Sequence, residues 1–375
     1  MIYNESKYNK DWKTMKLSDL GEFARGKSTY RPRNDKRLFE GGGYPLVQTG
    51  EIKEANLYIT HHTQEYGEFG LQQSKLWDTE TLCITIAANI AETALLSYPM
   101  CFPDSVVGFK AYKGISSEKF MYYVFDFIRS SIQNAASGST QDNINIDYLT
   151  SLDFKVPDKI AQDGMVELLS AIDEKILTNN EINDNLAAMA YDIYMHSFFS
   201  KKPNAKLKDI LVEADKSSIQ VGEAKQSTGE YPFFTSGSAI LKWDTPFIDG
   251  RNCFLNTGGN ADVKFYVGEA AYSTDTWCIS ANNNMSDYLY LLLVSIKPEL
   301  NQKFFQGTGL KHLQKPLLKD RPIYIPDFEE LQAFNQQINP MFNIISENTR
   351  ENQGLITLRD WLLPMLMNGQ ATIAD

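Results

Sequence analysis

The residues near the start of the chain that are best suited to chemistry form a short basic segment. Arg25-Gly26-Lys27-Ser28-Thr29-Tyr30-Arg31-Pro32-Arg33 combines cations, hydroxyls and an aromatic ring in a predicted loop. Arginine binds phosphate, or the O6 and N7 atoms of guanine, through two parallel hydrogen bonds. The segment therefore predicts contacts to nucleic acid, and the candidate residues are Arg25, Lys27, Ser28, Tyr30, Arg31 and Arg33. A solvated basic loop without a ligand is the alternative interpretation.

A second set of candidates lies in two polar turns that follow similar predicted strands. Gln48-Thr49-Gly50 comes after Tyr44-Pro45-Leu46-Val47, and Thr235-Ser236-Gly237 comes after Tyr231-Pro232-Phe233-Phe234. Amide and hydroxyl side chains form hydrogen bonds with base edges in the grooves of DNA. We therefore expect base contacts from Gln48, Thr49, Thr235 and Ser236.

A third set lies in two glycine-containing segments, Ser137-Gly138-Ser139-Thr140 and Gln306-Gly307-Thr308-Gly309. A structural turn before the next predicted strand explains these glycines as well as a ligand does. We keep both interpretations open. The candidate nucleic-acid contacts here are Ser139, Thr140, Gln141, Thr308, Lys311 and His312.

Sequence motifs for catalysis are incomplete. Asn339-Pro340-Met341-Phe342 resembles the Asn-Pro-Pro-Tyr/Phe motif of DNA amino-methyltransferases, but its third residue differs and no strand with a glycine-rich cofactor loop precedes it. Gly41-Gly42-Gly43 and Thr257-Gly258-Gly259-Asn260 do not continue into the Gly-Lys-Ser/Thr of a phosphate-binding loop. No Asp…Glu-x-Lys nuclease signature stands out. We predict a binding protein without catalytic residues.

Histidine and cysteine usage predicts neither a metal site nor a nucleophilic triad. His61 and His62 are adjacent, so on a strand they would point to opposite faces, and no Cys or acidic residue lies at ligand spacing. The remaining histidines, His196 and His312, lie far apart in the chain. The cysteines, Cys83, Cys101, Cys253 and Cys278, are scattered, which is typical of buried thiols in a reducing cytoplasm.

The elements that must position these candidates occur twice. Strand-and-turn patterns extend to about residue 157 and return over residues 201–326, and a long helical pattern follows each. From Gly138 and Gly307 to the helix ends, equivalent positions of the two copies keep the same difference in residue number, without a gap. Lys16-Leu17-Ser18-Asp19-Leu20 also matches Lys206-Leu207-Lys208-Asp209-Ile210, at a larger offset. A duplicated chain predicts a pseudo-twofold molecule.

Both predicted helices carry an apolar stripe with the average spacing of 3.5 that is typical of a coiled coil. Two asparagines interrupt each stripe at the same place, Asn179 and Asn183 in the first helix and Asn348 and Asn352 in the second. An antiparallel pairing would set Asn179 opposite Asn352 and Asn183 opposite Asn348. Such a layer costs stability but penalises slipped registers. The alternative is that each stripe packs on its own globular segment.

Two residues disturb this pattern in the second helix. Pro340 lacks an N–H donor and predicts a kink or a helix start, and Arg359 weakens the apolar stripe toward one end. About 35–40 helical residues at about 1.5 Å each predict a rod of roughly 50–60 Å. Such a rod would hold two globular segments at a fixed separation.

Composition and charge leave the type of partner open. The formal net charge is −11, which argues weakly against nucleic acid, but the acidic residues concentrate on the helices and the basic ones in segments between them. No apolar run approaches the roughly 18–20 residues that cross a membrane, and the first residues lack the apolar core of a signal peptide. We therefore expect a cytoplasmic protein without a membrane partner.

Taken together, these residues resemble the specificity subunit of Type I restriction–modification enzymes. Leu17-Ser18-Asp19-Leu20-Gly21-Glu22 followed by Arg25-Gly26-Lys27-Ser28 is similar to the start of that family, as is Tyr44-Pro45-Leu46-Val47-Gln48-Thr49-Gly50-Glu51-Ile52. The Gly-x-x-x-x-x-Ile/Leu segments before each Pro-Asp pair are similar too. The resemblance covers nearly the whole chain, and the ordered set is more specific than any one motif.

The resemblance implies an α+β protein in which two mixed α/β target recognition domains are joined by two long helices that form an antiparallel, pseudo-twofold coiled coil. The expected boundaries are residues 1–157 for the first recognition domain, 158–202 for the first spacer helix, 203–326 for the second recognition domain, and 327–375 for the second spacer helix and tail. Each domain would bind half of a split site in double-stranded DNA.

The family also implies partners that carry the catalysis. Two methyltransferase (modification) subunits would dock on the helices and bind S-adenosylmethionine, while this chain binds no cofactor. Motor-nuclease (restriction) subunits would join for cleavage. The alternative function is a coiled-coil scaffold that binds proteins without DNA specificity, which the acidic charge favours and the arginine-rich loop opposes. A truncated piece of a fused methyltransferase or nuclease is a further alternative, which the missing motifs oppose.

Overall fold

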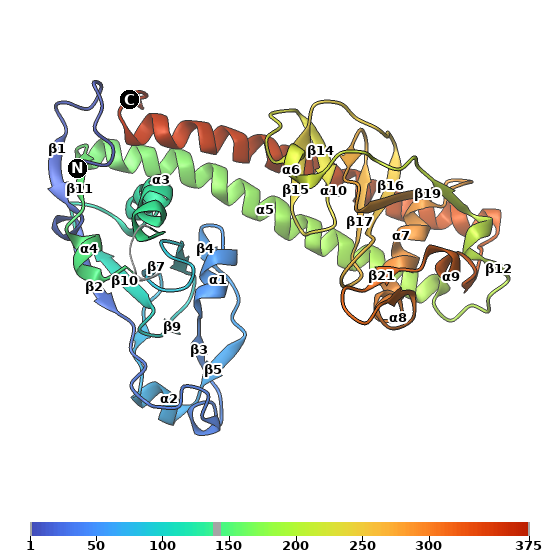
Figure 1. Ribbon diagram of the computed structural model, residues 1–375, viewed down its shortest axis with the longest axis horizontal. Helices are drawn as coiled ribbons and strands as arrows, with labels where there is room; N and C mark the ends of the chain where they lie inside the picture. The colour runs from blue at the N-terminus through green and yellow to red at the C-terminus, as the bar shows by residue number, and fades with distance from the viewer. Residues whose placement is uncertain (1, 138–143, 374–375) are drawn as a thin grey trace. The chain divides into compact units, whose positions relative to one another are not determined.

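The computed structural model describes residues 2–137 and 144–373, and the chain divides into two compact units (Figure 1). Unit 1 comprises Met1–Ile176 and Leu355–Asp375, and unit 2 comprises Leu177–Gly354. Each unit contains part of both long helices, because side chains of these helices belong to the core of each unit. The predicted domain boundaries instead give each long helix a segment of its own, whereas the structure divides each helix between the two units.

Unit 1 is built on two sheets. Its elements before the long helices are β1 (Lys13–Lys16), β2 (Gly21–Arg25), β3 (Tyr44–Leu46), α1 (Thr49–Glu54), β4 (Tyr58–Ile59), β5 (Gln64–Tyr66), α2 (Glu68–Gln72), β6 (Leu76–Trp77), β7 (Leu82–Thr85), β8 (Thr93–Leu96), β9 (Met100–Cys101), β10 (Val106–Ala111), α3 (Glu118–Ser137), α4 (Ile146–Thr150) and β11 (Asp153–Val156). The strand orders are β2-β10-β7-β8-β4 and β5-β3-β9-β6, and β1 pairs with β11.

The central strand of unit 1 is covered on both faces. Leu82 and Ile84 of β7 pack in a core with Phe120 of α3, whereas Cys83 between them packs with Phe102, beyond β9 of the second sheet. Alternate side chains of a strand point to opposite faces, so a strand between two layers is apolar throughout. This explains why the sequence shows an uninterrupted apolar run here.

Unit 2 repeats this plan. They are β12 (Ala205–Lys206), β13 (Leu211–Glu213), α6 (Val221–Ala224), β14 (Tyr231–Phe234), β15 (Ile240–Trp243), β16 (Arg251–Asn256), β17 (Val263–Val267), β18 (Ala271–Tyr272), β19 (Thr276–Ala281), α7 (Ser286–Ser295), α8 (Lys297–Glu299), β20 (Phe305–Gln306), β21 (His312–Leu313), α9 (Lys315–Lys319) and β22 (Pro322–Ile323). The main strand orders are β13-β19-β16-β17 and β15-β14-β18.

The two units have the same topology, as the duplicated sequence predicts. The order β2-β10-β7-β8 of unit 1 corresponds to β13-β19-β16-β17 of unit 2, and each second sheet contains one parallel pair, β3 with β9 and β14 with β18. The Ile144 amide donates to the Ile86 carbonyl at 3.1 Å, and the Leu313 amide donates to the Thr257 carbonyl at 3.0 Å. Ile144 and Leu313 are equivalent positions in the predicted repeat, since they are spaced as Gly138 and Gly307 are.

Two 40-residue helices, α5 (Lys159–Phe198) and α10 (Phe328–Met367), pair side by side in opposite directions (Figure 1). In unit 2, the Asn179 amide donates to Asn352 at 2.8 Å and the Asn348 amide donates to Asn183 at 2.9 Å. These are the pairs that the antiparallel register predicts. The direction of pairing is the same in unit 1, where Arg359 donates to Asp173 at 2.8 Å.

The helix ends also pack on the globular cores, so both interpretations of the apolar stripes apply. Met165 and Leu169 of α5 lie in the core of unit 1, and Tyr194 and Phe198 lie in the core of unit 2. The expectation for Pro340 was wrong in part, because α10 begins well before it, at Phe328, and continues through Pro340. Packing of the surrounding apolar side chains in the core of unit 2 holds this turn. Within the described ranges, no helix combines the length and apolar content needed to cross a membrane.

Candidate nucleic-acid interface

The basic segment of unit 1 is the loop that leaves β2. A Cβ atom at Gly26 would lie 2.3 Å from the Pro103 carbonyl oxygen, so only glycine allows this close approach. Arg33 donates to Asp104 at 2.6 Å, and Arg31 lies 3.7 Å from the same carboxylate. Asp104 therefore fixes both arginines on the loop that follows β9.

The remaining predicted residues of this loop fall into two groups. Tyr30 stacks edge-to-face on Phe69 at 5.2 Å, and its hydroxyl accepts a hydrogen bond from Arg37, so it supports the loop. Arg37 also donates to Asp35 from its side chain and its backbone, and these bonds hold the pKa of Asp35 at about 2. Arg25 and Lys27 are exposed, and neither makes an ion pair within the described residues. Both side chains are therefore free to bind an anion.

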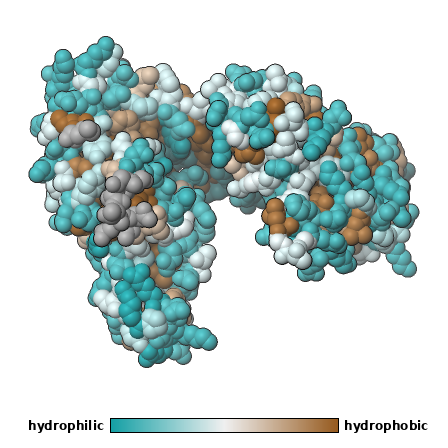
Figure 2. Space-filling view, viewed as in Figure 1, coloured by the Kyte–Doolittle hydropathy of each residue, from teal (hydrophilic) through white to brown (hydrophobic). Residues whose placement is uncertain are grey.

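The turn after β3 is organised by a buried carboxylate. The Glu51 carboxylate accepts hydrogen bonds from the backbone amide of Gln48 at 2.6 Å and from the Thr63 hydroxyl. The Gln48 side chain is half-buried and donates to Gln64 at 3.3 Å, and Thr49 begins α1. Figure 2 shows a mostly hydrophilic surface over the part of unit 1 that contains α2, β3 and β5.

In the corresponding turn of unit 2, the two predicted residues differ in burial. The Thr235 hydroxyl is buried and donates to the Ala239 carbonyl at 2.9 Å, so this side chain stabilises the turn. Ser236 is half-exposed at the same turn. Of the two predicted side chains, Ser236 is the one that is accessible to a ligand.

The third predicted set lies partly outside the described residues, which applies to Ser139, Thr140 and Gln141. Thr308, Lys311 and His312 are exposed in the hairpin of β20 and β21. The Gly259 amide donates to the Lys311 carbonyl at 2.9 Å, so the hairpin lies against the glycine-rich loop at residues 257–260. Asn256 shapes that loop by donating to two of its carbonyls. Two segments that the sequence treats separately therefore form one surface.

One candidate on this surface was missed by the sequence analysis. Gly21 pairs with Ala111 in unit 1, and Leu211 pairs with Ala281 in unit 2, so the loop at Arg25–Lys27 corresponds to the loop at 215–217. Lys216 is exposed in this second loop. The sequence could have indicated this residue, because the match between residues 16–20 and 206–210 reaches Lys216 when it is extended by a few residues. Among the described residues, no three His, Cys, Asp or Glu side chains gather into a group that could hold a metal ion.

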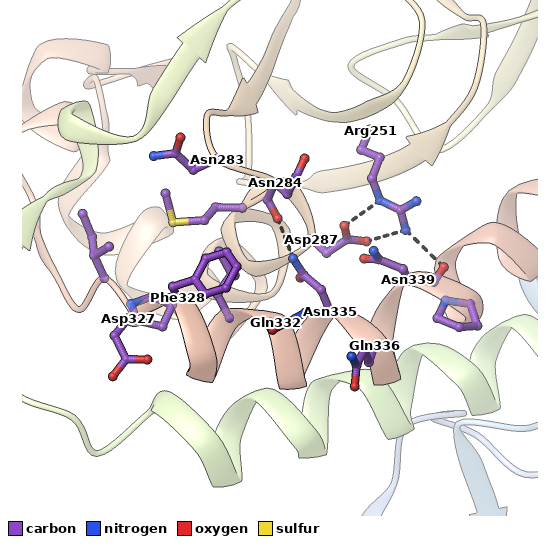
Figure 3. A pocket seen from close by; sticks show the side chains of 15 residues that line it. Arg251, Asn283, Asn284, Asp287, Asp327, Phe328, Gln332, Asn335, Gln336 and Asn339 are labelled. Carbon is purple, nitrogen blue, oxygen red and sulfur yellow. Dashed lines mark hydrogen bonds and ion pairs between the residues drawn. The ribbon is translucent and has the colours of Figure 1, made fainter.

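A second surface in unit 2 is a hollow of about 830 Å³ between the first half of α10 and the turn before α7 (Figure 3). Met285, Leu331 and the exposed ring of Phe328 supply its apolar lining. Asn335 donates to the Asn284 carbonyl at 2.9 Å. The side-chain oxygens of Asn335 and Asn339 are buried and have no hydrogen-bond partner among the described residues.

An ion pair closes one side of this hollow. Arg251 donates to both carboxylate oxygens of Asp287, at 2.6 and 2.9 Å, and to the Asn339 carbonyl at 3.1 Å (Figure 3). Burial raises the pKa of Asp287, and the Arg251 guanidinium opposes this rise. The pair ties β16 to α7 and α10, so it sets the shape of the wall.

Unit 1 carries exposed apolar residues at the corresponding place. The turn before α3 contains Gly114 with φ 79°, and the turn before α7 contains Asn284 with φ 57°. Ile115 beside the first turn is exposed. Ile160 in the first turn of α5 is 79% exposed, and Phe328 in the first turn of α10 is 78% exposed. Each unit therefore presents an apolar surface where its long helix begins.

The family described as "Type I restriction modification DNA specificity domain" matches residues 9–188 and again residues 201–355, which together make up most of the chain. The chain belongs to this family. As a specificity subunit, it recognises DNA and is not itself the catalyst, which agrees with the incomplete catalytic motifs.

Other specificity subunits are distant in sequence. The type I restriction enzyme MjaIX specificity subunit of Methanocaldococcus jannaschii is 21% identical, over 98% of this chain and 95% of its own length. A putative type I restriction enzyme MjaX specificity subunit of the same organism is 23% identical over 44% of this chain and 37% of its own length. The crystal structure of a type I restriction-modification system S subunit from M. genitalium has the same fold, with a TM-score of 0.64 and 15% identity over 98% of this chain and 99% of that one.

Proposed function

We propose that this specificity subunit binds a bipartite DNA site, with one unit at each half-site. The observation that carries the proposal is that the two units share one topology while their loops differ. In unit 1, Arg25 ends β2 and Lys27 lies in the loop that follows, whereas the loop after β13 in unit 2 contains Asp215, Lys216 and Ser217. Different side chains on the same framework would bind different base sequences.

Two modification subunits are the proposed partners, and they would supply S-adenosylmethionine and adenine methylation. The similar apolar surfaces at Ile160 and Phe328 support two copies of one partner, because exposed apolar patches mark interaction sites. Met189 of α5 and Leu358 of α10, which are equivalent positions in the repeat, are also exposed. Motor-nuclease subunits would join this complex in the cytoplasm for restriction.

The test is to express the full chain with modification subunits and to map the methylated sites in cellular DNA. We expect two short sequences separated by a spacer of fixed length. A continuous motif would contradict the assignment of one half-site to each unit. Methylation without any sequence preference would favour the alternative function, a protein scaffold, which the net charge of −11 supports.

Docking is tested by placing an aspartate at each apolar surface. Both Ile160→Asp and Phe328→Asp change exposed side chains in the first turn of a helix, where a carboxylate is favourable. We therefore expect folded subunits that bind one modification subunit instead of two in native mass spectrometry, and the double variant should bind none. A 1:2 complex formed by the double variant would place the partner elsewhere.

A further inference from the structure

A second hollow in unit 2, of about 410 Å³, is not explained by the docking of modification subunits. It lies where the loop after β13, the turn before β19 and the start of α9 come together, beside the loop at residues 257–260. Lys216, Thr274, Asp275, Trp277 and Lys315 contribute to its lining. The hollow therefore belongs to the surface that also carries the hairpin with Thr308 and Lys311.

Unpaired charges of both signs lie around this hollow. Lys216 and Lys315 are two cations, and Asp215 and Asp275 are two carboxylates. None of these side chains makes an ion pair within the described parts of the chain. Charged groups that are left unpaired beside a hollow are available to a polar ligand.

Two of these charged residues are anchored by their surroundings, Lys315 through its side chain and Asp275 through its backbone. The Lys315 ammonium lies 4.8 Å from the centre of the Trp277 ring, and the Trp277 indole donates to Glu213 at 2.8 Å. Glu213 is also paired with Lys319, so its charge is already balanced. The Asp275 carbonyl accepts two hydrogen bonds from Thr257, from the backbone amide and from the hydroxyl, each at 3.0 Å. The Lys315 ammonium is therefore held beside Trp277, and the backbone of Asp275 is fixed while its carboxylate stays exposed to a ligand.

The mixture of charges argues for a base pair and against a phosphate group. A phosphate site gathers cations, and the carboxylates of Asp215 and Asp275 would repel it. In the major groove, a guanine presents the acceptors O6 and N7 and its paired cytosine presents the N4 amino donor. Lysine is a donor and aspartate an acceptor, which matches this pair of edges.

We propose that Lys315 and Asp275 bind a G·C base pair of DNA, with the Lys315 ammonium donating to guanine and the Asp275 carboxylate accepting from cytosine N4. This assignment rests on the proposed function of the chain as a DNA-binding subunit. Trp277, Glu213 and Lys319 are positioning residues, because they orient Lys315 without touching the base pair.

The same set is absent from the corresponding positions of unit 1. The constant offset of the repeat relates Lys315 to Ile146, and the matching strands β10 and β19 relate Asp275 to Ser105. Neither counterpart carries a charge. The pair therefore contributes to recognition of one half-site only.

The experiment uses the full chain in complex with modification subunits, after its wild-type site has been mapped by methylation. Lys315→Met keeps the apolar contact with Trp277 and removes the charge, and Asp275→Asn removes the carboxylate charge. Lys303→Met, on an exposed side chain of the same unit outside the hollow, is the matched control. Binding is measured by competition with DNA duplexes in which each base pair of the site is replaced in turn.

Each variant should lose roughly 5- to 150-fold of discrimination at the same G·C pair, while preferences at other positions and in the other half-site stay unchanged. The control should keep full discrimination. Equal weakening on every sequence, with a salt slope reduced by about 1, would make Lys315 a phosphate contact and overturn the proposal. Loss of a modification subunit from the Lys315→Met complex would instead make the hollow a protein interface.

Failure of this inference is separable from failure of the proposed function. If the wild-type complex has no sequence-specific DNA binding, the proposed function fails before any variant is made. If the wild-type complex binds a bipartite site but neither variant changes discrimination at a G·C pair, only the assignment of Lys315 and Asp275 is overturned.

Discussion

Asn179 donates a hydrogen bond to Asn352 across the two long helices, with 2.8 Å between Nδ2 and Oδ1, and both side chains are buried. Asn179 also donates to Glu351, while its own side-chain oxygen has no partner among the described residues. A buried polar layer that is incompletely hydrogen-bonded costs stability. Its benefit is a single register, because any slip would bury an amide against an aliphatic side chain.

Replacing this layer by leucine should separate stability from register. Asn352→Leu alone should lower the free energy of unfolding by about 1–3 kcal/mol, because it leaves partner groups unsatisfied. The double variant Asn179→Leu, Asn352→Leu should recover or exceed the wild-type stability. It should also form oligomers of several sizes, because the helices of different chains can then pair in more than one register. Denaturant unfolding and native mass spectrometry measure the two effects. Asn185→Leu, on the exposed face of α5, is the control.

The ion pair of Asp173 with Arg359 should contribute strongly to the stability of unit 1. Asp173 is buried and also accepts a hydrogen bond from the Tyr123 hydroxyl at 2.7 Å. Asp173→Ala removes the buried partner of the Arg359 guanidinium, which keeps only its ion pair with the exposed Asp360 at 3.0 Å. Removing one partner of a buried ion pair typically costs about 3–5 kcal/mol of unfolding free energy. Asp163→Ala removes an exposed pair with Lys159 and should cost about 0.5 kcal/mol at most. Equal costs would refute a special role for burial.

The cations at the basic loop of unit 1 should affect DNA binding in two ways, according to whether they are paired within the protein. Arg25→Ala and Lys27→Ala remove unpaired cations, so each should weaken binding to all sequences and reduce the salt slope by about 1. Arg31→Ala and Arg33→Ala also release Asp104, and we expect relaxed specificity in the half-site bound by unit 1. Competition binding on both half-sites distinguishes these effects. Equal responses from the two half-sites would contradict the assignment of this loop to one of them.

Glu213 should make unit 2 sensitive to acid. Burial raises its pKa, but hydrogen bonds from Lys319 and Trp277 outweigh burial and lower the pKa below 4.5. A carboxyl group with a lowered pKa in the folded state stabilises the fold above pH 4.5, and this contribution is lost as the pH falls through the folded pKa. Glu213→Gln should therefore lose less unfolding free energy than wild type on acidification. Glu269→Gln, which changes an exposed side chain of the same unit, should follow wild type.

The paired helices should set the spacer between half-sites. Inserting one heptad after Leu186 of α5 and one before Ile345 of α10 keeps the asparagine layer and adds about 10 Å of helix. At about 3.4 Å per base pair, the spacer should grow by about three base pairs while both half-sites stay the same. Methylation mapping gives the spacer directly. An insertion into α5 alone disrupts the pairing and is the control, and an unchanged spacer in the double insertion would exclude this role.

Much of the fold was predictable because it repeats. The constant offset between the two copies relates Ile144 to Leu313, and the matched asparagines predict an antiparallel register. These features depend on spacing along the chain, which a sequence displays directly. The continuation of α10 through Pro340 was not predictable, because packing from the core of unit 2 overrides a local preference.

The candidate interface was harder to predict because its roles depend on contacts distant in sequence. Thr235 has the same residue type as a base-contacting side chain, but its hydroxyl is used within its own turn. Arg33 is held by Asp104, which lies 71 positions further along the chain. Lys315 stands out only once α9 lies against Trp277. Spacing identifies which loops are equivalent, but only the fold shows which side chains are already engaged.

The discontinuity of unit 1 has a consequence for biosynthesis. Asn4 donates to the Met367 carbonyl at 2.6 Å, and residues 355–375 complete a unit that begins at residue 1. Unit 2 is one continuous stretch, Leu177–Gly354. Because a ribosome releases the chain from its amino end, unit 2 has all of its residues available before unit 1 does. The unit whose first residues are translated first is therefore the unit whose last residues are translated last, so it is the later of the two to complete its fold.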